Sequence, residues 1–61
     1  MDKLEATNII WSAVLDVGVN AECTLDEFFN IMWHNDSAKE VIRQLDIDDC
    51  KEVMQAAWRR I

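Results

Sequence analysis

The chain of 61 residues contains no proline and only one glycine, Gly18. These two residue types usually mark loops and turns, so helix boundaries here must be read from capping residues and from hydrophobic periodicity. No segment alternates between polar and apolar residues for long enough to favour a β-strand. The pattern therefore predicts an all-α protein.

The first predicted helix runs from about Asp2 to Val17, with Asp2 as its cap and Gly18 as a left-handed stop. Apolar residues lie around most of its circumference. Its plainly polar residues form one narrow stripe at three-to-four spacing, namely Glu5, Asn8, Ser12 and Asp16. We expect this helix to be buried on more than one side.

The second predicted helix starts after Thr24 and ends near His34. Thr24 and Glu27 have the spacing of a capping box, in which each side chain accepts a hydrogen bond from the other residue's backbone N–H. Cys23 and Phe28 flank this box and can form a hydrophobic staple. It is the strongest local signal in the chain.

Two further helices follow. Ser37 and Glu40 have the spacing of a second capping box, which predicts a helix that starts after Ser37. The last helix is predicted from about Ile47 to the end of the chain. Acidic residues at its start and Arg59 and Arg60 at its end would complement the helix dipole.

These elements predict one all-α domain over residues 1–61, a small four-helix domain with a long first helix, two short middle helices and a long C-terminal helix. A chain this short buries a smaller fraction of its surface than a larger domain, so dimerisation would help to complete it. The predicted core holds the apolar stripes of the four helices: Leu4, Val14, Phe28, Met32, Val41, Ile42, Leu45, Met54 and Trp58.

The net charge of −6 opposes binding to nucleic acid and to anionic membranes, and it favours a basic protein surface. No signal peptide is recognisable, and no apolar run approaches the roughly 20 residues that span a bilayer. We therefore expect a cytoplasmic protein. Cys23 and Cys50 should be reduced and act as small core residues.

No arrangement of residues indicates catalysis, a cofactor or a metal site. His34 is the only histidine, and we expect it to be solvated or to cap a helix. Asp46, Asp48 and Asp49 lack the central glycine and the terminal glutamate of a calcium-binding loop. Residues 38–54 resemble a helix-turn-helix, but acidic residues open the second helix and would face DNA phosphates.

The function that the sequence favours is an acidic protein-interaction module that binds another protein and modulates it, as an inhibitor or adaptor. Large apolar residues are expected to form its interface: Ile10, Trp11, Leu15 and Trp33. The same surplus of apolar surface predicts a homodimer. A short chain beginning with its own methionine would suit a phage or mobile-element gene. Two alternatives are a nucleic-acid mimic that inhibits a DNA-binding protein and, less favoured, a helix-turn-helix-like transcriptional regulator.

Overall fold

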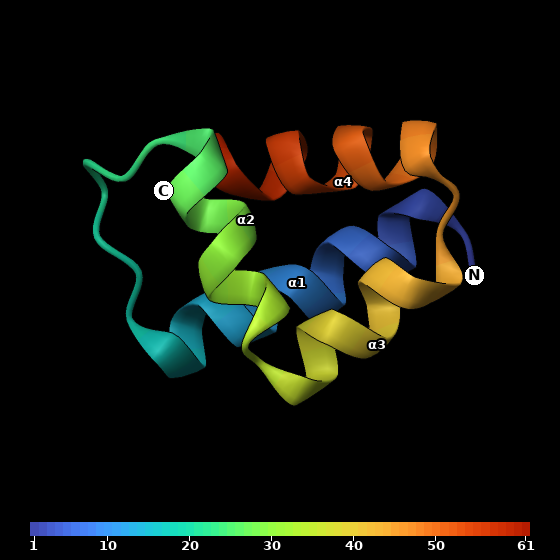
Figure 1. Cartoon of the computed structure of the whole chain (residues 1–61), viewed down its shortest axis with the longest axis horizontal. Coiled ribbons are helices and arrows are strands. Elements are labelled where there is room, and N and C mark those ends of the chain that lie inside the picture. The colour runs from blue at the N-terminus through green and yellow to red at the C-terminus, as the bar shows by residue number, and fades with distance from the viewer.

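The computed structural model describes all of residues 1–61 and contains four helices and no strand (Figure 1). They are α1 (Lys3–Val17), α2 (Leu25–Trp33), α3 (Asp36–Gln44) and α4 (Ile47–Trp58). α1 packs mainly against α4 and α3, and α2 crosses in front of α1 in the view of Figure 1. The predicted all-α domain with two short middle helices is confirmed.

An N-cap side chain opens each helix, and its oxygen accepts a hydrogen bond from a backbone N–H in the first turn. These caps are Asp2, Thr24, Asn35 and Asp46, at distances of 2.7, 3.2, 3.0 and 2.9 Å. The Glu27 carboxylate also accepts from the backbone N–H of Thr24, at 3.3 Å. The predicted capping box of α2 is therefore present.

The start of α3 differs from the prediction, because Ser37 lies within the helix and not before it. Asn35 takes the extended cap conformation, with φ −97° and ψ 127°, and its side chain caps Ala38. Asparagine is at least as good an N-cap as serine. The earlier start also places Asp36 in the first turn, where a carboxylate is favoured by the helix dipole.

The two longer helices end in different ways. α1 ends as predicted at Gly18, which adopts a left-handed conformation with φ +74° and donates its N–H to the Val14 carbonyl at 2.9 Å. α4 ends at Trp58, short of the predicted chain end. Arg59 and Arg60 lie in the terminal turn beyond it.

The core combines large side chains from α2 with both small and large ones from α1. Phe28 and Met32 are fully buried, as predicted, and so are Ala6 and Ile10 of α1. Val14, Val41 and Met54 are buried as well, whereas Ile42, Leu45 and Trp58 pack against the core while partly exposed. Leu4 was predicted to be buried but is 69% exposed, so that assignment was wrong.

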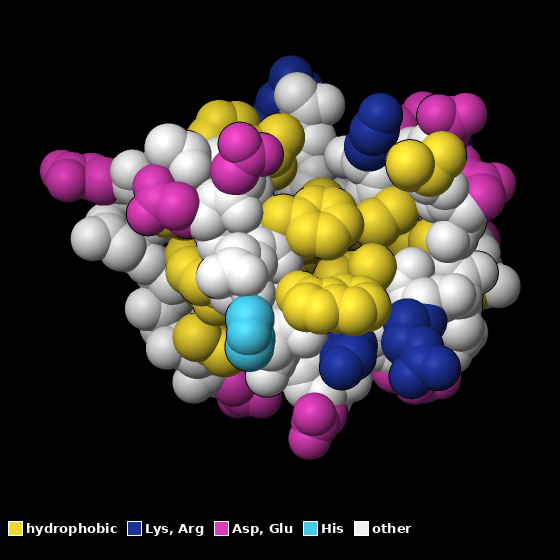
Figure 2. All heavy atoms as spheres, viewed as in Figure 1, with side chains coloured by type: hydrophobic (Ala, Val, Ile, Leu, Met, Phe, Trp, Pro, Cys, Tyr) yellow, Lys and Arg dark blue, Asp and Glu magenta, His cyan; other side chains and the backbone are white.

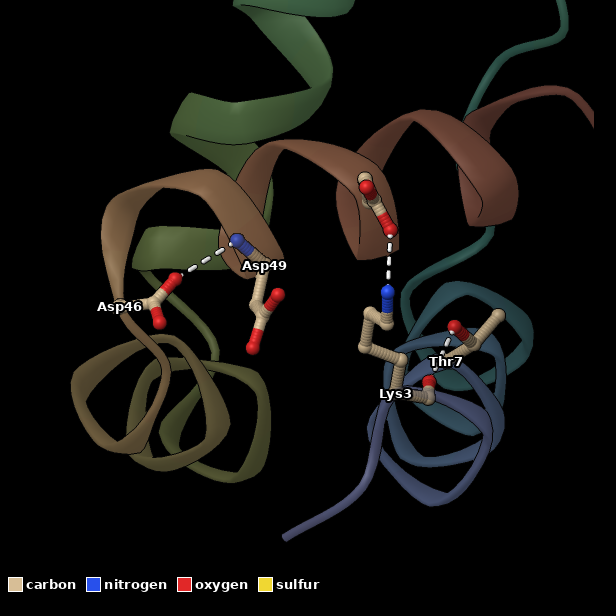
Figure 3. Close-up of polar contacts among 5 residues, drawn as sticks. Lys3, Thr7, Asp46 and Asp49 are labelled. Atoms are coloured by element: carbon tan, nitrogen blue, oxygen red, sulfur yellow. Dashed lines mark hydrogen bonds and ion pairs between the residues drawn. The ribbon is translucent and has the colours of Figure 1, made fainter.

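Two polar contacts join parts of the chain that are distant in sequence. At one end, the Lys3 ammonium of α1 donates to the Glu52 carboxylate of α4 at 2.8 Å (Figure 3). At the other, the Trp58 indole N–H donates to the Cys23 carbonyl at 3.0 Å and fixes the loop before α2 against α4. None of the four helices is both long enough and apolar enough to cross a lipid bilayer.

Candidate protein-binding surfaces

Several large apolar side chains are exposed to solvent instead of contributing to the small core. Those at least two fifths exposed are Met1, Leu4, Leu15, Val17, Trp33 and Ile47. Single exposed apolar residues need no explanation, but groups of them usually mark contact surfaces. The helical register places several of these residues, with their partly exposed neighbours, on two separate surfaces.

The first surface, the outer face of α1, consists of Leu4, Trp11 and Leu15. Their spacing of seven and four residues places them along one line of the helix, between the buried side, which includes Thr7 and Val14, and the polar stripe. Leu15 is 68% exposed, whereas Trp11 is half-buried. A shallow hollow beside Leu4 is lined by polar and acidic residues as well, including Asp2 and Glu5.

Ile10 was predicted to share this surface, and that assignment was wrong. Ile10 is fully buried at the centre of the inward face of α1, between Ala6 and Val14. Consecutive residues on a helix are separated by about 100° of rotation, so Ile10 and Trp11 cannot face the same way. The sequence grouped them only because they are adjacent.

Trp11 is partly shielded by the end of the chain. The guanidinium carbon of Arg60 lies 5.8 Å from the centroid of the Trp11 ring, within the range of a cation–π contact. Arg60 thus places one positive charge beside the outer face of α1, whose other flank carries Glu5 and Asp16.

The second surface, the α2–α4 groove, is lined by Leu25, Phe29 and Trp33 of α2 and by Met54 of α4. The three α2 residues recur every four positions and therefore share one side of the helix. Leu25, Phe29 and Met54 border a partly enclosed hollow of about 330 Å³. Phe29 also borders the adjoining hollow, which extends the apolar surface to Trp33.

Basic side chains border this groove although the protein is acidic overall. The Lys39 ammonium lies 4.9 Å above the centroid of the Trp33 ring, and Lys51 lines the hollow beside Met54. Asp26 is the one acidic residue that lines both hollows. Figure 2 shows the apolar patch in the centre of this face, with Lys and Arg side chains above and below its right-hand half.

His34 and Cys50 belong to residue types that are often used in catalysis or metal binding, but here each is part of the helical fold. The His34 ring lies at the C-terminal end of α2, with Nδ1 2.7 Å from the Asn30 carbonyl oxygen. Burial raises the pKa of the Cys50 thiol, which disfavours the reactive thiolate. No group of three or more histidine, cysteine or carboxylate residues lies close enough together to hold a metal ion.

Of the residues predicted for the interface, Leu15 and Trp33 are exposed and Trp11 is half-buried, whereas the exposed Leu4 and the other residues of the groove were not predicted for it. Leu25 and Phe29 lie beside Phe28 and Met32 on a wide apolar stripe, and such a stripe does not reveal which edge stays exposed. Their four-residue spacing with Trp33 was the available signal. Comparisons with protein-family models, curated proteins and solved structures found no match.

Proposed function

We propose that this chain is a protein-interaction module that binds another protein and modulates its activity. The observation that carries the proposal is the exposure of large apolar side chains on two defined surfaces, while alanines fill part of the core. Leaving Leu15 and Trp33 in water forgoes the stabilisation that their burial would bring, and a contact with another protein would recover it.

A pull-down from a source-cell lysate with the tagged protein tests the proposal when it is run with two surface variants. Leu15→Glu alters the outer face of α1, and Trp33→Glu alters the α2–α4 groove. Both residues are exposed, so neither change should unfold the protein, which a circular dichroism melt verifies. We expect at least one captured protein to be lost with one variant. Identical capture by the tag alone and by all three proteins would refute the proposal.

The finer part of the proposal is a homodimer formed through the outer face of α1. Leu4, Trp11 and Leu15 provide the apolar contact, and a two-fold axis would close the interface with a single patch. Sedimentation equilibrium of the wild type and of Leu15→Glu measures this directly. A wild type that remains at 7.1 kDa up to high micromolar concentration would exclude the homodimer.

A second candidate function is a nucleic-acid mimic, favoured by the exposure of nearly all of the acidic side chains and by a single ion pair. Binding that depends on charge weakens steeply with added salt, whereas an apolar interface responds little. Repeating the capture at low and high salt separates the two functions. A partner that is a DNA-binding protein and is released by salt would favour the mimic.

A further inference from the structure

We propose that the α2–α4 groove binds one amphipathic helix of a partner protein, whose apolar stripe is flanked by carboxylates. The proposal rests on the interaction function proposed above and names its surface and the chemistry of its partner. It follows from the shape of the groove, from the side chains that line it and from the charges at its border.

The shape of the groove suits a helix. Its apolar residues follow one side of α2 for two turns, from Leu25 through Phe29 to Trp33, and α4 forms the opposite wall with the exposed Lys51 and Gln55 and the buried Met54. A helix that docks in such a groove inserts residues at four- and three-residue spacing, which matches the spacing on α2. Trp33 is 40% exposed at one end, and an exposed aromatic ring is a common anchor of binding energy.

The lysines at the border of the groove favour a partner with negative charges. Lys39 lies over Trp33 at one end, and Lys51 lies beside Leu25 and Met54 at the other. Neither lysine forms an ion pair within the protein, because the only ion pair joins Lys3 to Glu52. Carboxylates on the flanks of a docked helix would meet both ammonium groups, and Asp26 would face a basic or neutral residue.

A second copy of this chain is a poorer occupant. A hollow is not complementary to itself, so two grooves cannot fill each other across a two-fold axis. Inserting the outer face of α1 into the groove of the next molecule would be a contact between two different surfaces, which closes only if its rotation closes a ring.

A displayed library of helical peptides tests the proposal and does not require the natural partner. The peptides share one apolar stripe, and their flanking positions vary among Glu, Lys and Gln. Selection on the wild-type protein should enrich Glu. The best peptide is then synthesised together with the same sequence carrying Lys at the flanks, and both are titrated against the ¹⁵N-labelled protein.

The expected result is binding of the Glu-flanked peptide, with shift changes in the residues of the groove. Trp33→Glu should weaken this binding about thirtyfold, the usual loss at an interface hot spot, whereas Ser12→Glu, an exposed position of α1 on neither surface, should leave it unchanged. The double variant Lys39→Glu with Lys51→Glu should prefer the Lys-flanked peptide. This reversal would not follow from loss of folding.

Four outcomes would overturn the inference. Equal enrichment of Lys and Glu would remove the charge argument, and shift changes confined to α1 would place the site elsewhere. A wild-type protein that forms concentration-dependent oligomers lost with Trp33→Glu would assign the groove to a second copy. Partner capture from the lysate that is lost with Leu15→Glu but kept with Trp33→Glu would reject the groove and leave the proposed function standing.

Discussion

α1 and α2 fill the core with different mixtures of side chains. α2 places its bulky Phe28 and Met32 in the core, whereas α1 buries Ala6 and Ala13 around Ile10 and leaves Leu4 and Leu15 in water. Small residues allow helix backbones to approach closely, and α1 lies against both α3 and α4. The comparison shows that the size of an apolar residue does not decide whether it is buried; its place on the helix decides.

The largest expected effect is at a large buried side chain of α2. Phe28→Ala should lower the free energy of unfolding by about 3–5 kcal/mol, because it removes a fully buried ring and leaves a cavity. In so small a domain this is much of the total stability. Chemical denaturation followed by circular dichroism measures it. Phe29→Ala is the matched control, and it should cost less because Phe29 is only partly buried.

The buried alanines of α1 should be sensitive to a larger side chain, which would lower stability. Ala6→Leu introduces a large side chain where the alanine is fully buried, and we expect a loss of about 1–3 kcal/mol from overpacking. Ser12→Leu, on the exposed side of the same helix, should stay within about 0.5 kcal/mol. Equal denaturation midpoints for the two variants would show that α1 does not pack closely through Ala6.

Smaller effects distinguish the start of α2, which was predicted correctly, from the start of α3, which was misplaced. Thr24→Ala removes the N-cap of α2 and should cost about 1 kcal/mol. Ser37→Ala should change stability by less than about 0.5 kcal/mol, because Asn35 caps α3 instead and Ser37 is exposed. Thermal melts of the two variants give the comparison, and a larger loss for Ser37→Ala would restore the original boundary.

Local signals in the sequence were sufficient for the number and order of the helices. Asp2, Thr24 and Gly18 act within one or two turns, so their roles could be predicted without knowing the tertiary packing. The start of α3 was misplaced because Ser37 and Glu40 have the capping-box spacing, whereas Asn35 has only Ala38 three residues on. In the structure the Asn35 side chain nevertheless caps α3.

The candidate surfaces were harder to predict because α1 is apolar around most of its circumference. Such a helix has no distinct inward stripe, so its rotation depends on which side best fits the other helices. Leu4 and Ile10 were therefore exchanged between surface and core. Trp33 was predicted only as an interface residue; it is 40% exposed, and its contact with Lys39 depends on how α2 meets α3.

The smallest expected effect is also the sharpest test of the outer face of α1. At low protein concentration, Leu4→Ala should change the free energy of unfolding by less than about 0.5 kcal/mol, because Leu4 is 69% exposed. A buried leucine would cost about 2–5 kcal/mol on the same substitution.

If the outer face of α1 forms a dimer, stability depends on protein concentration, and the cost of Leu4→Ala should grow as concentration rises. Denaturation at low and high micromolar concentration therefore distinguishes three states of Leu4. A large cost at both concentrations means burial within one chain, a cost only at the higher concentration means self-association, and no cost at either means a side chain free to contact another protein.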